Sequence, residues 1–151
     1  MTKNEDIVDA LNELVVINND RIQGYEKAVE DTEDTNLKDI FRHYVVQSQG
    51  FRSQLADHIV RIDGAAVSDA THTDAASKLH RAWIDIKAAL TGKNRDTILS
   101  SVEFGEDAAL EAYRDAIGKD PLPAYIKEVL IKQLGNLQTA HDRMKTLRKQ
   151  L

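Results

Sequence analysis

Residues 11–29 read LNELVVINNDRIQGYEKAV, and this stretch sets the expectation for the whole chain. Apolar side chains recur in it and its flank three or four residues apart, at Ile7, Leu11, Leu14, Ile22, Tyr25 and Val29. That spacing places them on one face of an α-helix. Asn18 falls within this apolar face. We therefore expect an amphipathic helix over residues 4–34.

A second long helix is expected after the polar run DTEDTN at residues 31–36. Thr35 is a candidate N-cap for it, and Gly64 is a natural left-handed C-cap. Residues 65–76 are small and polar, which predicts a loop. A shorter helix is then expected over residues 75–90.

Two more long helices complete the predicted set. The third begins at Asn94 or Asp96 and ends at Gly118. The fourth has Asp120 as its N-cap and Pro121 at its first helical position, where the missing N–H costs nothing. It is expected to run to the end of the sequence.

The lengths of the connections predict how these helices are arranged. Short connections make the first and second helices one antiparallel hairpin, and the third and fourth another. The segment between the second and third helices is long enough to return along the bundle. We therefore expect one all-α domain over residues 1–151. Its predicted fold is a ferritin-like four-helix bundle with an additional short helix in the long crossover.

Composition excludes several classes of function. The formal net charge of −5 disfavours binding to nucleic acid or to anionic membrane surfaces. Cysteine is absent, which excludes disulfides, thiolate metal sites and cysteine catalysis. The N-terminal residues lack the apolar core of a signal peptide, and no stretch reaches membrane-spanning length. We expect a cytoplasmic protein with no membrane or nucleic-acid partner.

Two helices carry a polar residue followed seven positions later by tyrosine. These pairs are Glu106 with Tyr113 and Asn18 with Tyr25. The pattern resembles that of ferritin-like di-iron proteins, in which one helix of each hairpin presents a Glu with a Tyr seven residues on. The other helix of each hairpin presents Glu-x-x-His, because residues three apart share a helix face. Oxygen and imidazole ligands of this kind suit Fe(II) or Mn(II).

The Glu-x-x-His half of that pattern is degenerate in this chain. Gln138 and His141 stand at this spacing in the fourth helix, and Gln49 and Arg52 are the nearest counterpart in the second. An inward Arg52 would repel a metal ion and pair with Glu106. Ser48 and Phe51 fit the apolar face of the second helix equally well, so its register stays open.

The chain also resembles, over nearly its whole length, a bacterial family of ferritin-like four-helix-bundle proteins whose function is uncharacterised. The segments that carry this resemblance are LNELVVINNDRIQGYEKAV, LHRAWIDIKAALTG, GEDAALEAYRDAI and LQTAHDRMKTL. The resemblance implies the bundle fold and no particular activity.

Two interpretations of the inward polar residues follow. The first is a polar core layer that fixes helix register, formed by Asn18, Tyr25, Gln49, Arg52, Glu106 and Tyr113. The second is a metal site for iron or manganese, formed by Glu106, Gln138, His141 and Asn18.

The first interpretation predicts a non-enzymatic bundle with a degenerate di-iron site and no cofactor. Such a protein would act as a homo-oligomer or through other protein contacts, in a stress-related role. The alternative is a metal-binding protein that uses Glu106 and His141. An iron-dependent oxidase or iron store is a third reading.

Overall fold

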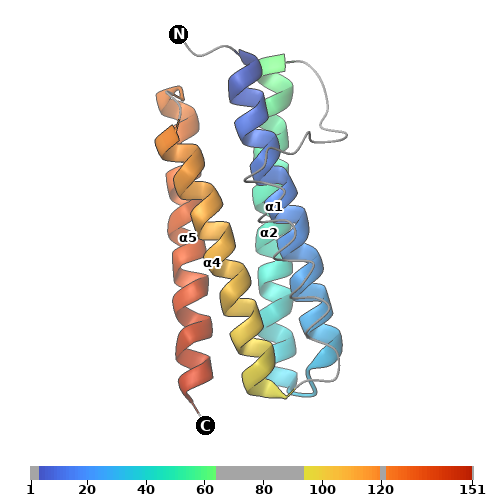
Figure 1. Ribbon diagram of the computed structural model, residues 1–151. Helices are drawn as coiled ribbons and strands as arrows, with labels where there is room; N and C mark the ends of the chain where they lie inside the picture. The colour runs from blue at the N-terminus through green and yellow to red at the C-terminus, as the bar shows by residue number, and fades with distance from the viewer. Residues whose placement is uncertain (1–3, 64–93, 120–121, 151) are drawn as a thin grey trace.

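The computed structural model describes residues 4–63, 94–119 and 122–150, and these residues form α-helices, with no strand among them (Figure 1). The helices are α1 (Asn4–Asp31), α2 (Thr35–Asp63), α4 (Arg95–Lys119) and α5 (Ala124–Lys149). The expected all-α class is therefore confirmed. The short helix expected over residues 75–90 lies outside the described residues, as do Gly64, Asp120 and Pro121.

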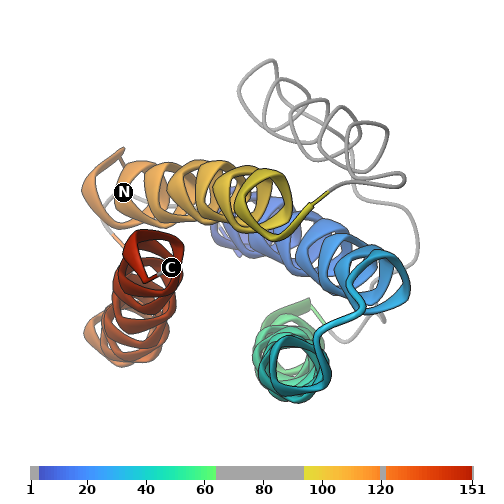
Figure 2. The same cartoon turned by 90° about the horizontal axis from the view of Figure 1, so that it is seen from below.

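The helices pack as two antiparallel hairpins, α1 with α2 and α4 with α5. The two hairpins pack against each other mainly through α1 and α4. Helices α2 and α5 have few contacts, as the view along the bundle shows (Figure 2). Figure 1 places the end of α2 and the beginning of α4 at opposite ends of the bundle. Helix α1 therefore runs antiparallel to α4.

The turn between α1 and α2 shows a different cap from the one expected. Helix α1 ends at Asp31, three residues before the expected end. The Oδ1 atom of Asp34 accepts hydrogen bonds from the backbone N–H groups of Asn36 and Leu37, at 2.9 and 3.2 Å. An N-cap side chain binds the N–H groups two and three residues ahead, so Asp34 is the cap. The prediction of Thr35 was wrong, because Thr35 is already the first helical residue.

In the second hairpin, α4 begins where expected and α5 begins later than expected. Asn94 caps α4, because its Oδ1 accepts a hydrogen bond from the N–H of Thr97 at 2.9 Å. Helix α5 begins at Ala124 and not at Pro121, with Pro123 as its N-cap at φ −55° and ψ 147°. The prediction overlooked Pro123, which disfavours helical geometry at the residue before it. This keeps Leu122 out of the helix, which begins after Pro123, whose ψ is not helical.

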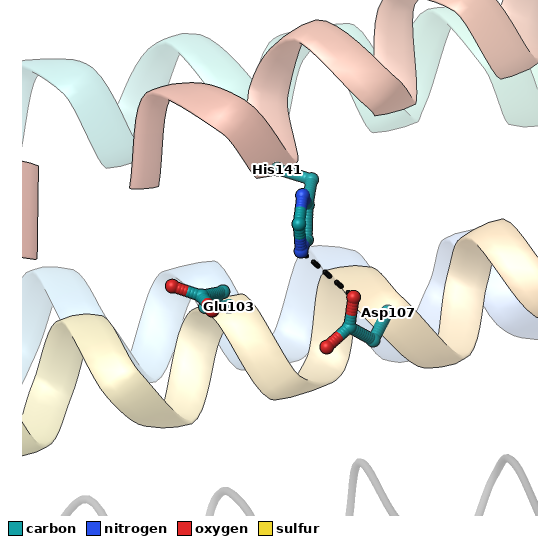
Figure 3. A group of neighbouring side chains, drawn as sticks. All are labelled: Glu103, Asp107 and His141. Carbon is teal, nitrogen blue, oxygen red and sulfur yellow. Dashed lines mark ion pairs between the residues drawn. The ribbon is translucent and has the colours of Figure 1, made fainter. Parts of the chain in front are cut away.

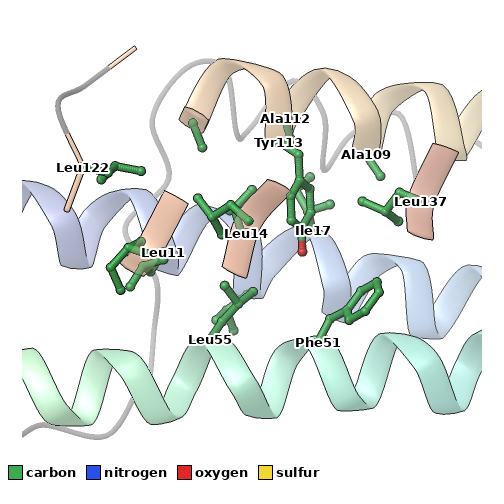
Figure 4. Packing of buried hydrophobic residues seen from close by; sticks show 14 of the residues in the cluster. Leu11, Leu14, Ile17, Phe51, Leu55, Ala109, Ala112, Tyr113, Leu122 and Leu137 are labelled. Atoms are coloured by element: carbon green, nitrogen blue, oxygen red, sulfur yellow. The ribbon is translucent and has the colours of Figure 1, made fainter. Parts of the chain in front are cut away.

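The apolar core has two parts. The larger cluster includes Leu11, Leu14, Ile17, Phe51, Leu55, Ala109, Tyr113 and Leu137 (Figure 4). The smaller cluster lies nearer the α1–α2 turn and includes Tyr25, Phe41, Tyr44, Val102, Ala140 and Met144. In α1, α2 and α4 buried polar residues separate the two clusters. Arg21, Ser48 and Glu106 are among them, and these three form a polar layer across the core.

The corrected cap gives the first testable prediction. Replacing Asp34 with Ala should lower the free energy of unfolding by about 1 kcal/mol, because two N–H groups of α2 lose their acceptor. Thr35→Ala is the matched control and should change that energy by less than about 0.5 kcal/mol. Urea denaturation followed by circular dichroism measures both. A larger loss in Thr35→Ala than in Asp34→Ala would restore Thr35 as the cap.

Candidate functional site

A fully buried ion pair joins α1 to α4 in the polar layer. The Arg21 Nε and Nη2 atoms donate to the two carboxylate oxygens of Glu106 at 2.6 and 2.8 Å. Both side chains are 0% exposed. The remaining Arg21 nitrogen, Nη1, donates to the Ser48 hydroxyl at 2.9 Å, and this hydroxyl donates in turn to the Tyr44 carbonyl oxygen. The guanidinium of Arg21, which belongs to α1, is therefore hydrogen-bonded to side chains of both α2 and α4.

Aromatic rings surround the same guanidinium. The Arg21 Cζ atom lies 5.4 Å from the centre of the Tyr25 ring, 5.6 Å from that of Tyr44 and 6.0 Å from that of Phe51. A cation over an aromatic face is attracted by the ring quadrupole, and the attraction increases when water is excluded. These rings also close the layer off from the solvent.

The electrostatics of the layer keep the Arg21 side chain charged. Burial alone would lower the pKa of Arg21, but the charge of Glu106, its hydrogen bond and the neighbouring tyrosines together outweigh burial, and the pKa is raised above its ordinary value. The pKa of Tyr25 is also raised, first by burial and then by the charge of Glu106. The positive charge of Arg21 and the negative charge of Glu106 thus cancel. Two parallel hydrogen bonds join the guanidinium to the carboxylate.

A second chain of hydrogen bonds runs beside the ion pair and crosses all four described helices. The Asn18 Nδ2 atom donates to the Tyr113 hydroxyl at 2.8 Å, and that hydroxyl donates to Gln133 Oε1 at 2.6 Å. Gln133 Nε2 then donates to Gln54 Oε1 at 2.8 Å. Burial raises the pKa of Tyr113, although the hydrogen bond from Asn18 opposes it.

The layer has an approximate internal symmetry that follows the repeated polar-to-tyrosine spacing. Asn18 of the first hairpin meets Tyr113 of the second, and Glu106 of the second lies beside Tyr25 of the first. Arg21 breaks the symmetry. It stands three residues after Asn18, whereas the corresponding residue, three positions after Glu106, is Ala109. The Tyr25 hydroxyl and Asn18 Oδ1 are buried without a hydrogen-bond partner among the described residues.

Helix α2 presents residues other than the expected pair to this layer. Ser48 and Phe51 are buried, whereas Gln49 is exposed and Arg52 is half-buried. Arg52 donates to Asn19 Oδ1 at 2.7 Å and has no contact with Glu106. The expectation that Gln49 and Arg52 join the layer is therefore wrong. The apolar periodicity of α2 permitted both registers, and packing against α1 selects the one with Ser48 inside.

The four predicted metal ligands are not brought together. Arg21 occupies both oxygens of Glu106, and Asn18 is bonded to Tyr113. His141 Nε2 instead lies 2.7 Å from Asp107 at the surface. Gln138 accepts a hydrogen bond from Arg114 and donates to Asp142. These arrangements leave Glu106 and His141 with separate partners and no shared site.

Sequence reasoning missed Arg21, although a signal for it was present. Arg21 stands three residues after Asn18 and four before Tyr25, so it shares their helix face. An arginine on an apolar face needs an anion, and Glu106 was already predicted to point inward.

A different group of possible ligands lies on the seam between α4 and α5. Glu103 and Asp107 of α4 and His141 of α5 each offer one ligand atom, and these atoms lie within 4.8 Å of one another (Figure 3). The Nδ1 atom of His141 lies 3.2 Å from Asp142 Oδ1. Hydrogen bonds from His141 and Gln138 lower the pKa of Asp142.

Removing one partner of the buried pair should be costly. Glu106→Leu leaves the Arg21 guanidinium buried without a counter-ion, and we expect the free energy of unfolding to fall by about 3–5 kcal/mol. The double variant Arg21→Met/Glu106→Leu removes both charges and should be within about 1 kcal/mol of the unaltered chain or more stable. Urea denaturation measures both. A double variant as unstable as the single one would contradict this account.

The raised pKa values of Tyr25 and Tyr113 predict loss of stability in alkali. Their folded pKa values exceed the unfolded value of about 10, so above about pH 10 the unfolded chain binds fewer protons than the folded one. The free energy of unfolding should therefore be constant with respect to these groups below that pH. Above it, each group should lower that energy by at most about 1.4 kcal/mol per pH unit.

Urea denaturation between about pH 9 and about pH 11 tests this dependence. Tyr25→Phe and Tyr113→Phe should each reduce the alkaline slope. Tyr125→Phe is the matched control, because Tyr125 is 54% exposed. An equal slope in all three variants would show that the buried tyrosines do not cause the loss.

The described helices and the sequence as a whole were compared with known proteins. None of the described helices has the length and apolar character that a membrane span needs. No curated protein and no solved structure matches the chain. One family model matches residues 6–119, which is most of the sequence. The chain therefore belongs to the family described as "Domain of unknown function (DUF2383)".

Proposed function

We propose that this chain is a ferritin-like helical bundle that has lost its core metal centre and that acts by self-association rather than by catalysis. The observation that carries the proposal is the buried guanidinium of Arg21, which holds both oxygens of Glu106. A di-iron centre needs several carboxylates turned towards two cations. In the polar layer of the described residues Glu106 is the carboxylate at this place, and a permanent cation of the chain, Arg21, already neutralises it.

The arrangement of the hairpins supports the ferritin-like part of the proposal. The two antiparallel hairpins are connected between opposite ends of the bundle, which agrees with one long crossover. Asn18 and Glu106 lie at corresponding places, each close to a tyrosine of the other hairpin. Iron or manganese bound by Glu106 and His141 is less well supported, because these side chains have separate partners.

The exposed face of α5 supports self-association. Tyr125, Glu128, Lys132 and Gly135 are exposed, and their spacing of three, four and three residues places them on one stripe. If a second copy packed its α5 antiparallel about a two-fold axis level with Leu130, Glu128 would face Lys132 of the copy. Tyr125 would face Gly135 of the copy, where no atom lies within 4 Å of an added Cβ. This stripe is therefore complementary to itself, as an isologous dimer requires.

The absence of oxidase activity can be measured with an oxygen electrode. After addition of Fe(II), oxygen consumption with the protein should equal that of Fe(II) in buffer alone. Consumption that depends on the protein and disappears in Glu106→Gln would overturn the proposal. Glu111→Gln, an exposed carboxylate of the same helix, is the control for a general effect of charge.

The self-association can be tested by charge reversal with light scattering as the measurement. The unaltered chain should have twice the mass of one chain. Lys132→Glu should dissociate the dimer, because it places two carboxylates opposite each other, and Glu128→Lys/Lys132→Glu should restore it. Lys145→Glu makes the same charge change away from the stripe and should have no effect. A monomeric unaltered chain, or equal dissociation by Lys145→Glu, would contradict the proposal.

A further inference from the structure

We propose that Glu103, Asp107 and His141 form a binding site for one divalent first-row transition-metal ion on the seam between α4 and α5. This site is separate from the polar layer in the core and from the self-association stripe. It goes beyond the proposed function, which needs no metal.

The three side chains come from adjacent helices and converge on one point (Figure 3). Glu103 and Asp107 are four residues apart, so they share a face of α4, and His141 reaches that face from α5. The possible ligand atoms lie within 4.8 Å of one another, and His141 Nε2 is 2.7 Å from Asp107 Oδ1. Bonds of about 2.0–2.2 Å to one metal therefore need only small side-chain rotations.

An outer shell already holds the imidazole in place. His141 Nδ1 lies 3.2 Å from Asp142 Oδ1, and this oxygen also accepts a hydrogen bond from Gln138 Nε2 at 3.0 Å. Gln138 Oε1 is fixed in turn by Arg114 Nη2 at 2.9 Å. A carboxylate on the second ring nitrogen is the usual support of a metal-bound histidine, because it orients the ring and fixes its tautomer. Here that support leaves Nε2 directed at Asp107.

Glu103 is the ligand with an unfilled hydrogen-bonding site. Its Oε1 atom is buried and has no hydrogen-bond partner among the described residues. Arg148 Nη1 lies 3.5 Å from this oxygen and donates to the Ser100 hydroxyl. Arg148 therefore competes with a metal ion for Glu103 and weakens the site without filling it.

The donor set determines which ions fit. One imidazole nitrogen and two carboxylate oxygens suit borderline ions such as Zn(II), Co(II) or Fe(II), with water completing the coordination. Ca²⁺ needs six to eight oxygen ligands, which this seam does not offer. A bound ion would link α4 to α5 and stabilise the second hairpin, since the three ligands come together only in the folded chain.

Calorimetric titration of the full chain with Zn(II), after treatment with a chelator, tests the site. We expect about one equivalent to bind and the midpoint of thermal unfolding to rise. Asp107→Asn and His141→Ala should each weaken binding by at least about tenfold. The controls are Asp115→Asn and His43→Ala, which alter exposed residues of the same types elsewhere. If Zn(II) binding is not saturable, or if the control variants weaken it equally, the proposal is overturned.

A gain of affinity provides a second, independent test that does not depend on a loss of ligands. Arg148→Gln should tighten Zn(II) binding, because Glu103 loses its competing cation. Lys149→Gln removes the same charge from the next residue, which is exposed, and should tighten binding less. Equal effects of the two variants would show that only the general charge of the surface matters, and would contradict the assigned role of Glu103.

Discussion

The buried pair of Arg21 and Glu106 is the constraint on which the other features of the bundle depend. Neither charge can stay in the core alone, because an unpaired buried ion costs several kcal/mol. The pair therefore fixes α1 against α4, and the third guanidinium nitrogen fixes α2 through Ser48. The apolar clusters on either side could tolerate a shift of register, but two matched hydrogen bonds at 2.6 and 2.8 Å could not.

If the bundle is ferritin-like, as proposed, the pair also explains why its core needs no iron. In such a core, carboxylates are kept ionised by metal ions, which can be lost or exchanged. Here the cation is part of the chain and Glu106 is satisfied permanently. Asn18, Tyr113 and Gln133 beside the pair form a chain of uncharged hydrogen-bonding groups. The metal site proposed for this chain lies instead at the surface, where His141 is close to the carboxylates of Asp107 and Asp142.

Periodicity alone was sufficient to predict α1, α2, α4 and α5 and the inward direction of Asn18, Tyr25, Glu106 and Tyr113, because all four residues fall on apolar stripes. It could not choose the register of α2, since two sets of residues fit the stripe and only packing decides. Arg21 was missed because a lone arginine is usually a surface residue. The α4–α5 seam was also beyond reach, because Asp107 and His141 meet only after two helices have packed.

The buried guanidinium can be observed directly by nuclear magnetic resonance of Arg21 in ¹⁵N-labelled protein. If Arg21 holds Glu106 as described, its Nε–H and Nη–H protons should give separate signals that exchange slowly with water. Added Zn(II), which is diamagnetic, should leave these separate signals in place, because an ion at the α4–α5 seam does not displace Arg21 from Glu106. A single averaged signal in fast exchange would contradict the pair, and loss of the separate signals on addition of Zn(II) would place a metal ion on Glu106.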